Sequence, residues 1–415
     1  FYFDEFKANM LLALMREKMK EAEDKVAKVF KPKVDRRLIY RKETKSGAIS
    51  KTGTWDNPSG KGVRLSSDEH HFLSQGGNFK TFRTTVVDFN IGSRKQIGEY
   101  LLEFGWKPKE FTVNGRPVVN EKTLSEITDI PEAELIKDYL MYQKREAQVK
   151  SWIEAVKEDG RVHGFVIPNG TITGRMTHRE PNMAQVPNSS SPYGIECREC
   201  WTVPKGYNLV GIDASGLELR MLASMMNDED YTNEIINGDI HTHNQRIAGL
   251  ESRNTAKVFI YALCYGAGNN RLSEIIGGSA EDAGRIRKHF LHNLPSFRSL
   301  KDEVARTSAK GYLKGLDGRK LYVRSEHSAL NTLLQGAGSI VMKKALLIFN
   351  EYIEDMDAHF VCNVHDEWQV EAREDVAEEV GMLGVKAIKE AGEHFKLSCP
   401  LDGEYHVGRN WAETH

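Results

Sequence analysis

The sequence has little cysteine and no long apolar run. Its five cysteines lie from residue 197 onward, and only Cys197 and Cys200 form a CxxC pair. A single pair without a second one only weakly indicates zinc, so we interpret the cysteines as ordinary thiols outside any disulfide framework. No apolar run reaches the ~18 residues needed to span a bilayer, and the start lacks a charged-then-apolar signal segment. These absences predict a cytoplasmic protein with no membrane partner.

The sequence also lacks a strong net charge, but its charges are segregated. The formal charge is −2, yet residues 31–85 contain twelve Lys or Arg against five Asp or Glu. The small total therefore does not exclude an anionic partner. A length of 415 residues exceeds one compact core and predicts two or three lobes. The 40% hydrophobic and 28% charged residues exclude wholesale disorder.

Helical periodicity and glycine-rich stretches divide the first part of the chain. Residues 5–30 place apolar side chains on one stripe, which predicts a long amphipathic helix. From 31 to about 90 the pattern breaks into Gly, Ser, Thr and basic residues. This break predicts an inserted, loop-rich basic subdomain, with a solvated, partly disordered surface loop as an equal alternative. Helical periodicity returns at 93–105 and 132–158.

Two aspartates are expected at the ends of strands. Leu209 to Asp213 has the pattern of a buried strand that ends in a carboxylate, and a helix follows from Ser215. Residues 356–371 have the pattern of strand, tight turn and strand, which places Asp366 on a hairpin tip. Each aspartate alone is an ordinary cap or turn residue. If the strands are neighbours, the two carboxylates can bind two divalent ions about 3.5–4 Å apart, an arrangement suited to phosphoryl transfer.

The strongest motif is RNTAKVFIYALCYGAG, which spaces two cations and two aromatic residues four positions apart. Four steps of an α-helix return nearly to the same face, so these side chains form one stripe roughly 18 Å long. Cations can bind a triphosphate, and aromatic rings can meet a sugar and a base. A ladder of solvated cations is the alternative, but its continuation into tyrosines favours a nucleotide site. The stripe consists of Arg253, Lys257, Tyr261 and Tyr265.

A polar stretch, TGRMTHREPNMAQVP, and the later LNTLLQGAG carry guanidinium and amide groups with few apolar residues to bury. A polar loop held by its own hydrogen bonds is one interpretation. The other is that Arg175, Asn331 and Gln335 reach the minor-groove acceptors that every correct base pair offers in similar positions. These groups could check the shape of a pair without reading its sequence.

Together the motifs resemble DNA polymerase family A, the Pol I family, and in particular its branch from T-seven-type podoviruses. TGRMTHREPNMAQVP, GIDASGLELR, DIHTHNQ, RNTAKVFIYALCYGAG, LNTLLQGAG and NVHDEW follow in the family's order, from about residue 161 to the C-terminus. The resemblance implies an α+β, right-hand polymerase fold with an antiparallel palm sheet, helical fingers and a helical thumb. The expected domains are a thumb at 1–155 with the basic loop-rich insert at about 31–88, a palm at 156–235 and 326–415, and fingers at 236–325.

The resemblance also implies roles for individual residues. Asp213, Asp366 and the backbone carbonyl of Ala214 are expected to bind two Mg²⁺ ions, or Mn²⁺ instead, with Glu367 as a further acid near them. Glu218 is expected to pack under the incoming sugar, to exclude a ribose 2′-hydroxyl and to bond Tyr265. Tyr261 is expected to face that sugar, as the choice associated with acceptance of dideoxynucleotides. The triphosphate groups are His241, Arg253 and Lys257, with Lys257 as proton donor to pyrophosphate, and the primer-template groups are Arg175, Asn331, Gln335 and His365.

The function that the resemblance implies is DNA-templated extension of a primer 3′ end with dNTPs, releasing pyrophosphate, in viral genome replication in a host cytoplasm. The chain opens at FYFDEFKANM without the proofreading exonuclease that the family commonly carries, so we expect no proofreading by this chain and a separate exonuclease as a partner. A processivity factor at the 31–88 insert and a helicase-primase are the other expected partners. In the best-known member of this branch an insert in the thumb recruits host thioredoxin for the first role, but the insert of this chain differs in length and sequence, which leaves its partner open.

Two other functions compete with this interpretation. A single-subunit RNA polymerase relative shares the two aspartates and the Lys-to-Tyr helix, but Glu218 argues against it because an RNA polymerase needs room for the 2′-hydroxyl. A catalytically inactive DNA-binding scaffold would have no reason to retain both aspartates together with Lys257.

Overall fold

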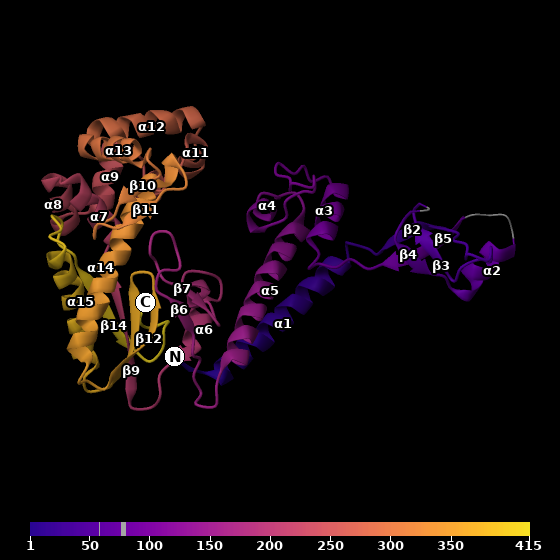
Figure 1. Cartoon of the computed structure of the whole chain (residues 1–415), viewed down its shortest axis with the longest axis horizontal. Coiled ribbons are helices and arrows are strands. Elements are labelled where there is room, and N and C mark those ends of the chain that lie inside the picture. The colour runs from indigo at the N-terminus through magenta and orange to yellow at the C-terminus, as the bar shows by residue number, and fades with distance from the viewer. Residues whose placement is uncertain (58, 76–79) are drawn as a thin grey trace. The chain divides into compact units, whose positions relative to one another are not determined.

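The computed structural model describes residues 1–57, 59–75 and 80–415, apart from the side chain of Lys80 (Figure 1). The described chain divides into two compact units. One contains Phe1–Leu11 and Val149–His415, and the other contains Leu12–Gln148.

A four-stranded antiparallel sheet organises the first unit. Its strand order is β12-β13-β9-β14, with β9 in an interior position. The predicted buried strand and the predicted hairpin are both confirmed, since β12 and β13 are consecutive strands paired with each other. The strands are β9 (Tyr207–Ala214), β12 (Ala358–Val364), β13 (Glu367–Arg373) and β14 (Gly403–Gly408).

Helices cover this sheet at close range. On α15 (Ala377–His394), Gly384 lies so near the sheet that a Cβ there would meet Ile212 Cδ1 at 2.6 Å. On the sheet itself, a Cβ at Gly211 would meet the Thr414 carbonyl oxygen at 2.2 Å. Gly384 therefore lets α15 approach Ile212 of the sheet, and Gly211 leaves room for the last residues of the chain.

The apolar helix α14 (Ala329–Ile353) packs in the same core. By length and composition alone, the segment Glu326–Ile353 could cross a membrane. However, 56% of its most apolar stretch of 18 residues is buried inside the protein. Its contacts with α15 and with α7 (Leu217–Met226) account for that apolar composition.

Consecutive helices run from Glu229 to Ser308, largely within the stretch where helical fingers were expected. Phe259, Phe290 and Phe297 lie in their core and meet edge to face at centroid distances of 6.0 and 5.6 Å. The helices are α8 (Glu229–Asn237), α9 (Ile240–Ala248), α10 (Arg253–Cys264), α11 (Asn269–Ile276), α12 (Ala280–Asn293) and α13 (Pro295–Ser308). A hairpin of β10 (Tyr312–Lys314) and β11 (Lys320–Tyr322) follows them.

Short elements complete this unit. The strand pairs are β1 (Tyr2–Phe3) with β8 (Trp201–Thr202), and β6 (Phe165–Ile167) with β7 (Thr177–Arg179). The short helices are α6 (Gly194–Glu199) and the 3₁₀ turns Met183–Gln185 and Glu326–Ser328.

The predicted long helices of the second unit are confirmed. Its core includes Val26, Phe30, Tyr100 and Leu101, with Phe30 and Tyr100 in ring contact at 5.2 Å. The helices are α1 (Glu5–Ala27), α3 (Arg94–Glu103), α4 (Glu121–Ser125) and α5 (Pro131–Ala155).

The basic insert differs from the loop-rich expectation, because it contains a four-stranded antiparallel sheet and a helix. The strand order is β4-β3-β2-β5, and Ile39, Leu65 and Leu73 form a small separate core. The alternation of β2 is hard to recognise in the sequence because arginines lie on both of its faces. The elements are β2 (Lys33–Tyr40), β3 (Thr52–Trp55), β4 (Gly62–Arg64), α2 (Ser67–Gln75) and β5 (Lys80–Val87).

Candidate active site

Asp213 and Asp366 lie next to each other at one end of the sheet. The pairing of β9 with β13 places Asp213 opposite Glu367, the residue after Asp366. The Ala214 N–H donates to the Asp366 carbonyl oxygen at 3.2 Å. Asp366 lies in the turn between β12 and β13, where His365 adopts a φ of +58°. The adjacency that sequence alone could not establish is therefore present.

The two carboxylates repel each other. Burial, followed by the charges of Asp366 and Glu367, raises the pKa of Asp213 to about 7. A cation between the carboxylates would relieve that repulsion. Within the described residues no group of three or more His, Cys, Asp or Glu could hold a metal ion, so further ligands would be backbone oxygens such as that of Ala214. These hard oxygen donors fit Mg²⁺ or Mn²⁺.

Glu367 is buried beneath this end of the sheet and remains charged. Trp411 Nε1 donates to its Oε1 at 2.6 Å, and His415 Nδ1 lies 2.9 Å from its Oε2. Burial favours the protonated acid, but the bonds from His415, Gln369 and Trp411 outweigh it and lower the pKa of Glu367. Sequence reasoning missed Trp411 and His415, because nothing in the local sequence shows that the last residues pack against β13.

The predicted stripe lies on α10 with the expected spacing. Ser252 caps the helix by accepting from the Thr255 N–H at 3.0 Å. Arg253 and Lys257 are exposed, and the rings of Tyr261 and Tyr265 lie 6.4 Å apart.

Two features of the stripe were not predicted, namely an ion pair of Arg253 and a raised pKa of Tyr261. Arg253 Nε lies 2.6 Å from Oδ2 of Asp239, the residue that caps α9. Burial, together with the charges of Glu218 and Asp366, raises the pKa of Tyr261 to about 12. The charge of Asp366 therefore acts on Tyr261, which indicates that α10 lies near the hairpin turn.

His241 lies beside this stripe. Its ring is 6.4 Å from that of Tyr261. Burial, and then the charges of Lys257 and Arg253, lower the pKa of His241. In the described part of the chain its buried Nδ1 has no hydrogen-bond partner. A neutral imidazole with an unused ring nitrogen is available to a ligand here.

Glu218 connects three segments of the site. Tyr265 donates its hydroxyl to Oε2 of Glu218 at 2.7 Å, as predicted, and Arg175 Nη2 lies 3.1 Å from Oε1. Burial and this bond raise the pKa of the Tyr265 phenol. Glu218 on α7 is thereby fixed from α10 and from the loop that carries Arg175.

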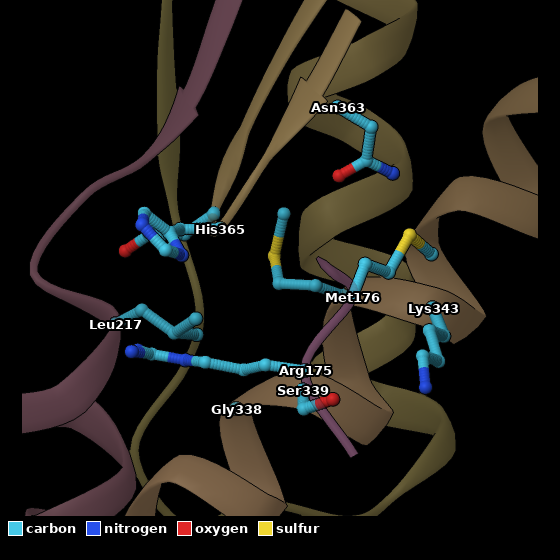
Figure 2. A pocket seen from close by; sticks show the side chains of 10 residues that line it. Arg175, Met176, Leu217, Gly338, Ser339, Lys343, Asn363 and His365 are labelled. Carbon is cyan, nitrogen blue, oxygen red and sulfur yellow. The ribbon is translucent and has the colours of Figure 1, made fainter. Parts of the chain in front are cut away.

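The predicted primer-template residues line one open groove of about 640 Å³. Arg175, Asn331, Gln335 and His365 all contribute to it. A second cavity adjoins it, and Figure 2 shows Arg175, His365 and Lys343 around this cavity. Lys343 donates to Asn169 Oδ1 at 2.7 Å and to the Gly174 carbonyl oxygen at 2.5 Å. Sequence reasoning did not find Lys343, which fastens the Arg175 loop to α14.

Comparison with known proteins identifies relatives of this chain. The sequence model of DNA polymerase family A matches residues 75–413. A DNA-directed DNA polymerase of Enterobacteria phage T3 is 41% identical, and one of Escherichia phage T7 is 40% identical, each over 79% of this chain and 53% of the relative. The chain therefore spans about half the length of these curated relatives.

One solved structure is similar over nearly the whole chain. It is the POL domain of Pol1 from M. smegmatis in complex with DNA primer-template and dNTP, with a TM-score of 0.79 at 20% identity. The match covers 99% of this chain and 67% of that one. This similarity confirms the predicted polymerase fold of mixed helices and antiparallel sheet.

Proposed function

The chain belongs to DNA polymerase family A, and we propose that it extends the 3′ end of a DNA primer with dNTPs under the direction of a template strand. The observation that carries the proposal is that Asp213 and Asp366 lie side by side at the end of the sheet, and that the charge of Asp366 acts on Tyr261 of α10. Carboxylates for divalent ions thus share one site with cations and rings suited to a nucleotide.

The residues present divide the chemistry between them. Asp213, Asp366 and the Ala214 carbonyl would hold two Mg²⁺ ions, or Mn²⁺, which would supply activation of the primer hydroxyl and neutralisation of the leaving pyrophosphate. Arg253, Lys257 and His241 bind the triphosphate by charge and hydrogen bonds. Lys257 then gives its proton to the leaving pyrophosphate oxygen. Glu367, held by Trp411 and His415, keeps the Asp366 turn in place.

Glu218 selects the sugar. Because Tyr265 and Arg175 fix its carboxylate on both sides, it cannot move away from an added 2′-hydroxyl. A deoxyribose then fits against it, while a ribose would collide with it or leave it without its hydrogen bonds. Tyr261 faces the same sugar. This arrangement favours a DNA polymerase over a single-subunit RNA polymerase.

The groove beside the aspartates holds the primer-template. Arg175, Asn331 and Gln335 present donors to the minor-groove acceptors shared by correct pairs, and His365 lies at the primer terminus. The similarity to polymerases of two phages supports viral genome replication in a host cytoplasm as the setting. A helicase-primase and a processivity factor at the 31–88 insert are the proposed partners there.

Isosteric replacement of the aspartates tests the proposal. Asp213→Asn or Asp366→Asn should lower single-nucleotide incorporation roughly a thousandfold or more, because each removes a charge from the metal pair. Primer-template binding, measured by fluorescence anisotropy, should persist.

Glu404→Gln is the matched control, because Glu404 is paired with Asp213 across β14 but is exposed. Incorporation by either aspartate variant at the level of this control would refute the metal-binding role. Ribonucleotide extension as fast as deoxyribonucleotide extension by the parent would instead indicate an RNA polymerase. If the parent incorporates neither deoxyribonucleotides nor ribonucleotides, the result would indicate a catalytically inactive DNA-binding scaffold.

A further inference from the structure

Among the described residues, no helix or strand packs on one face of the insert's sheet. Cross-strand partners of an antiparallel pair share a face, which places Val34 with Val86, Arg36 with Thr84 and Leu38 with Phe82 on one side of β2 and β5. Val34 and Val86 are each 66% exposed, and Phe82 is 49% exposed. These six residues are called the open face below.

The opposite face is covered by α2, and its arginines are paired. Leu73 of α2 packs there on Ile39. Arg37 and Arg83 also lie on that side, at 4.5 and 5.3 Å from the Trp55 ring. Arg37 is paired with Asp56 and Arg83 with Glu69. That face therefore has an occupant, and its two arginines are neutralised within the subdomain.

The open face differs from the opposite face in its charges. Among its described side chains there is no carboxylate, and Arg36 has no ion pair with any described residue. Its guanidinium lies over the Phe82 ring at 4.2 Å from the centroid. An unneutralised cation stacked on an exposed ring provides both a flat surface and phosphate-binding donors.

We propose that the open face binds single-stranded DNA, with Phe82 and Arg36 stacking on bases and the Arg36 guanidinium also contacting phosphate. A four-stranded sheet with aromatic side chains on its exposed face can stack two or three bases of a single strand. Stacking is accessible to unpaired bases, whereas a duplex buries its base faces, so the single strand is the preferred ligand. The excess of basic residues in 31–85 adds attraction for the backbone.

The proposal rests on the proposed function only in that a template supplies such a single strand. The sheet and its charges would bind a strand whether or not Asp213 and Asp366 support catalysis. Strand binding and nucleotide addition are therefore measured separately on the same proteins.

The test uses the full chain, first saturated with an unlabelled blunt DNA hairpin that occupies the groove near the aspartates. A fluorescein-labelled oligo-dT of roughly 16 nucleotides then probes the remaining single-strand sites by anisotropy. Phe82→Ala and Arg36→Ala should each weaken its binding roughly tenfold, while Phe82→Trp should retain it. A labelled duplex of equal length should bind more weakly than the single strand to the parent.

The matched controls lie in the same subdomain but off the open face. Phe72→Ala removes a ring that is 50% exposed on α2, and Lys51→Ala removes one exposed positive charge. Both should leave oligo-dT affinity unchanged, and thermal unfolding verifies that all variants fold. The proposal would be overturned if Phe82→Ala bound oligo-dT as tightly as the parent, if Phe72→Ala lost as much affinity, or if the parent preferred duplex. Any of these results would indicate that the open face binds a protein partner instead. A dimer of the parent that Phe82→Ala dissociates would overturn it in favour of a second copy.

Addition of one nucleotide to a primer with a one-base template overhang separates this proposal from the proposed function. All of these variants should retain parental single-addition rates. An inactive parent with intact oligo-dT binding would refute the polymerase assignment alone. If the parent adds a nucleotide but the Phe82 and Arg36 variants bind oligo-dT as tightly as the parent does, only the open-face assignment is refuted.

Discussion

At the residue scale, the protonation of Asp213 couples metal binding to pH. Its folded-state pKa of about 7 lies above the ordinary value of 3.8, so the ion-free folded protein binds a proton that the unfolded chain has released. The contribution of Asp213 to ion-free stability is therefore largest at low pH and is lost as pH rises through about 7. A bound cation requires the deprotonated form.

We therefore expect the rise in melting temperature caused by Mg²⁺ to be small at pH 6 and to grow toward pH 8. The apparent Mg²⁺ affinity should fall up to about tenfold per pH unit below 7. Thermal unfolding with and without Mg²⁺ across this range measures both quantities. Asp213→Asn should remove the pH dependence, and an Mg²⁺ shift that is equal at pH 6 and pH 8 would contradict the role of this carboxylate.

Sequence found the residues whose signal lies within one element. Arg253, Lys257 and Tyr261 follow helical spacing, and Asp213 ends an apolar run. Apart from the Tyr265–Glu218 bond, which the resemblance implied, sequence did not reveal the partners that hold site residues in place across the fold. Asp239 binds Arg253 from another helix, and His415 reaches Glu367 from the end of the chain. Such pairs depend on packing between segments that no local spacing encodes.

At the element scale, α14 and the Arg175 loop are joined by one side chain. Lys343 donates from α14 to Asn169 and Gly174, on the segment that leads into Arg175. Lys343→Met keeps the aliphatic stem but removes both bonds, so Arg175 should lose its fixed position. We expect primer-template affinity to fall roughly three- to tenfold and mismatch discrimination to decrease.

Competition between correct and mismatched dNTPs, with anisotropy for DNA affinity, measures the effect of Lys343→Met. Lys344→Met is the control, because it removes the same charge from the next position of α14. Equal behaviour of the two variants would show that Lys343 acts only through its charge.

The prediction of elements succeeded where a strand is apolar and failed where a strand carries charged residues on both faces. β9 is apolar and buried from Leu209 to Ile212, and its strand was recognised. β2 carries Arg36 on an uncovered face and Arg37 on the face with the small core, so its alternation resembles a polar loop. The three-residue core of the insert is too small to mark its strands by hydrophobicity.

At the scale of the whole molecule, the insert is a separable sheet within a chain of segregated charge. Lys33 and Val87 are cross-strand partners where β2 begins and β5 ends, so their Cα atoms are only about 5 Å apart. Residues 34–86 can therefore be replaced by two glycines without moving the flanking backbone. The protein that lacks residues 34–86 should add a single nucleotide at the parental rate. It should release the template sooner, because the basic stretch is missing.

Product length under a heparin trap measures this release, and rapid quench measures the single addition. Products as long as those of the parent would show that the insert does not retain DNA. Failure of single addition, with normal thermal unfolding, would instead assign the insert a part in the chemistry.

The interior position of β9 has a consequence for partial unfolding. The backbone of Asp213 is paired with Glu367 on one side and with Glu404 on the other. Amide hydrogens in such a strand exchange with solvent only when the whole sheet opens, whereas exposed helices open locally. Mild denaturant should therefore abolish nucleotide selection while the Asp213 amide is still protected from deuterium.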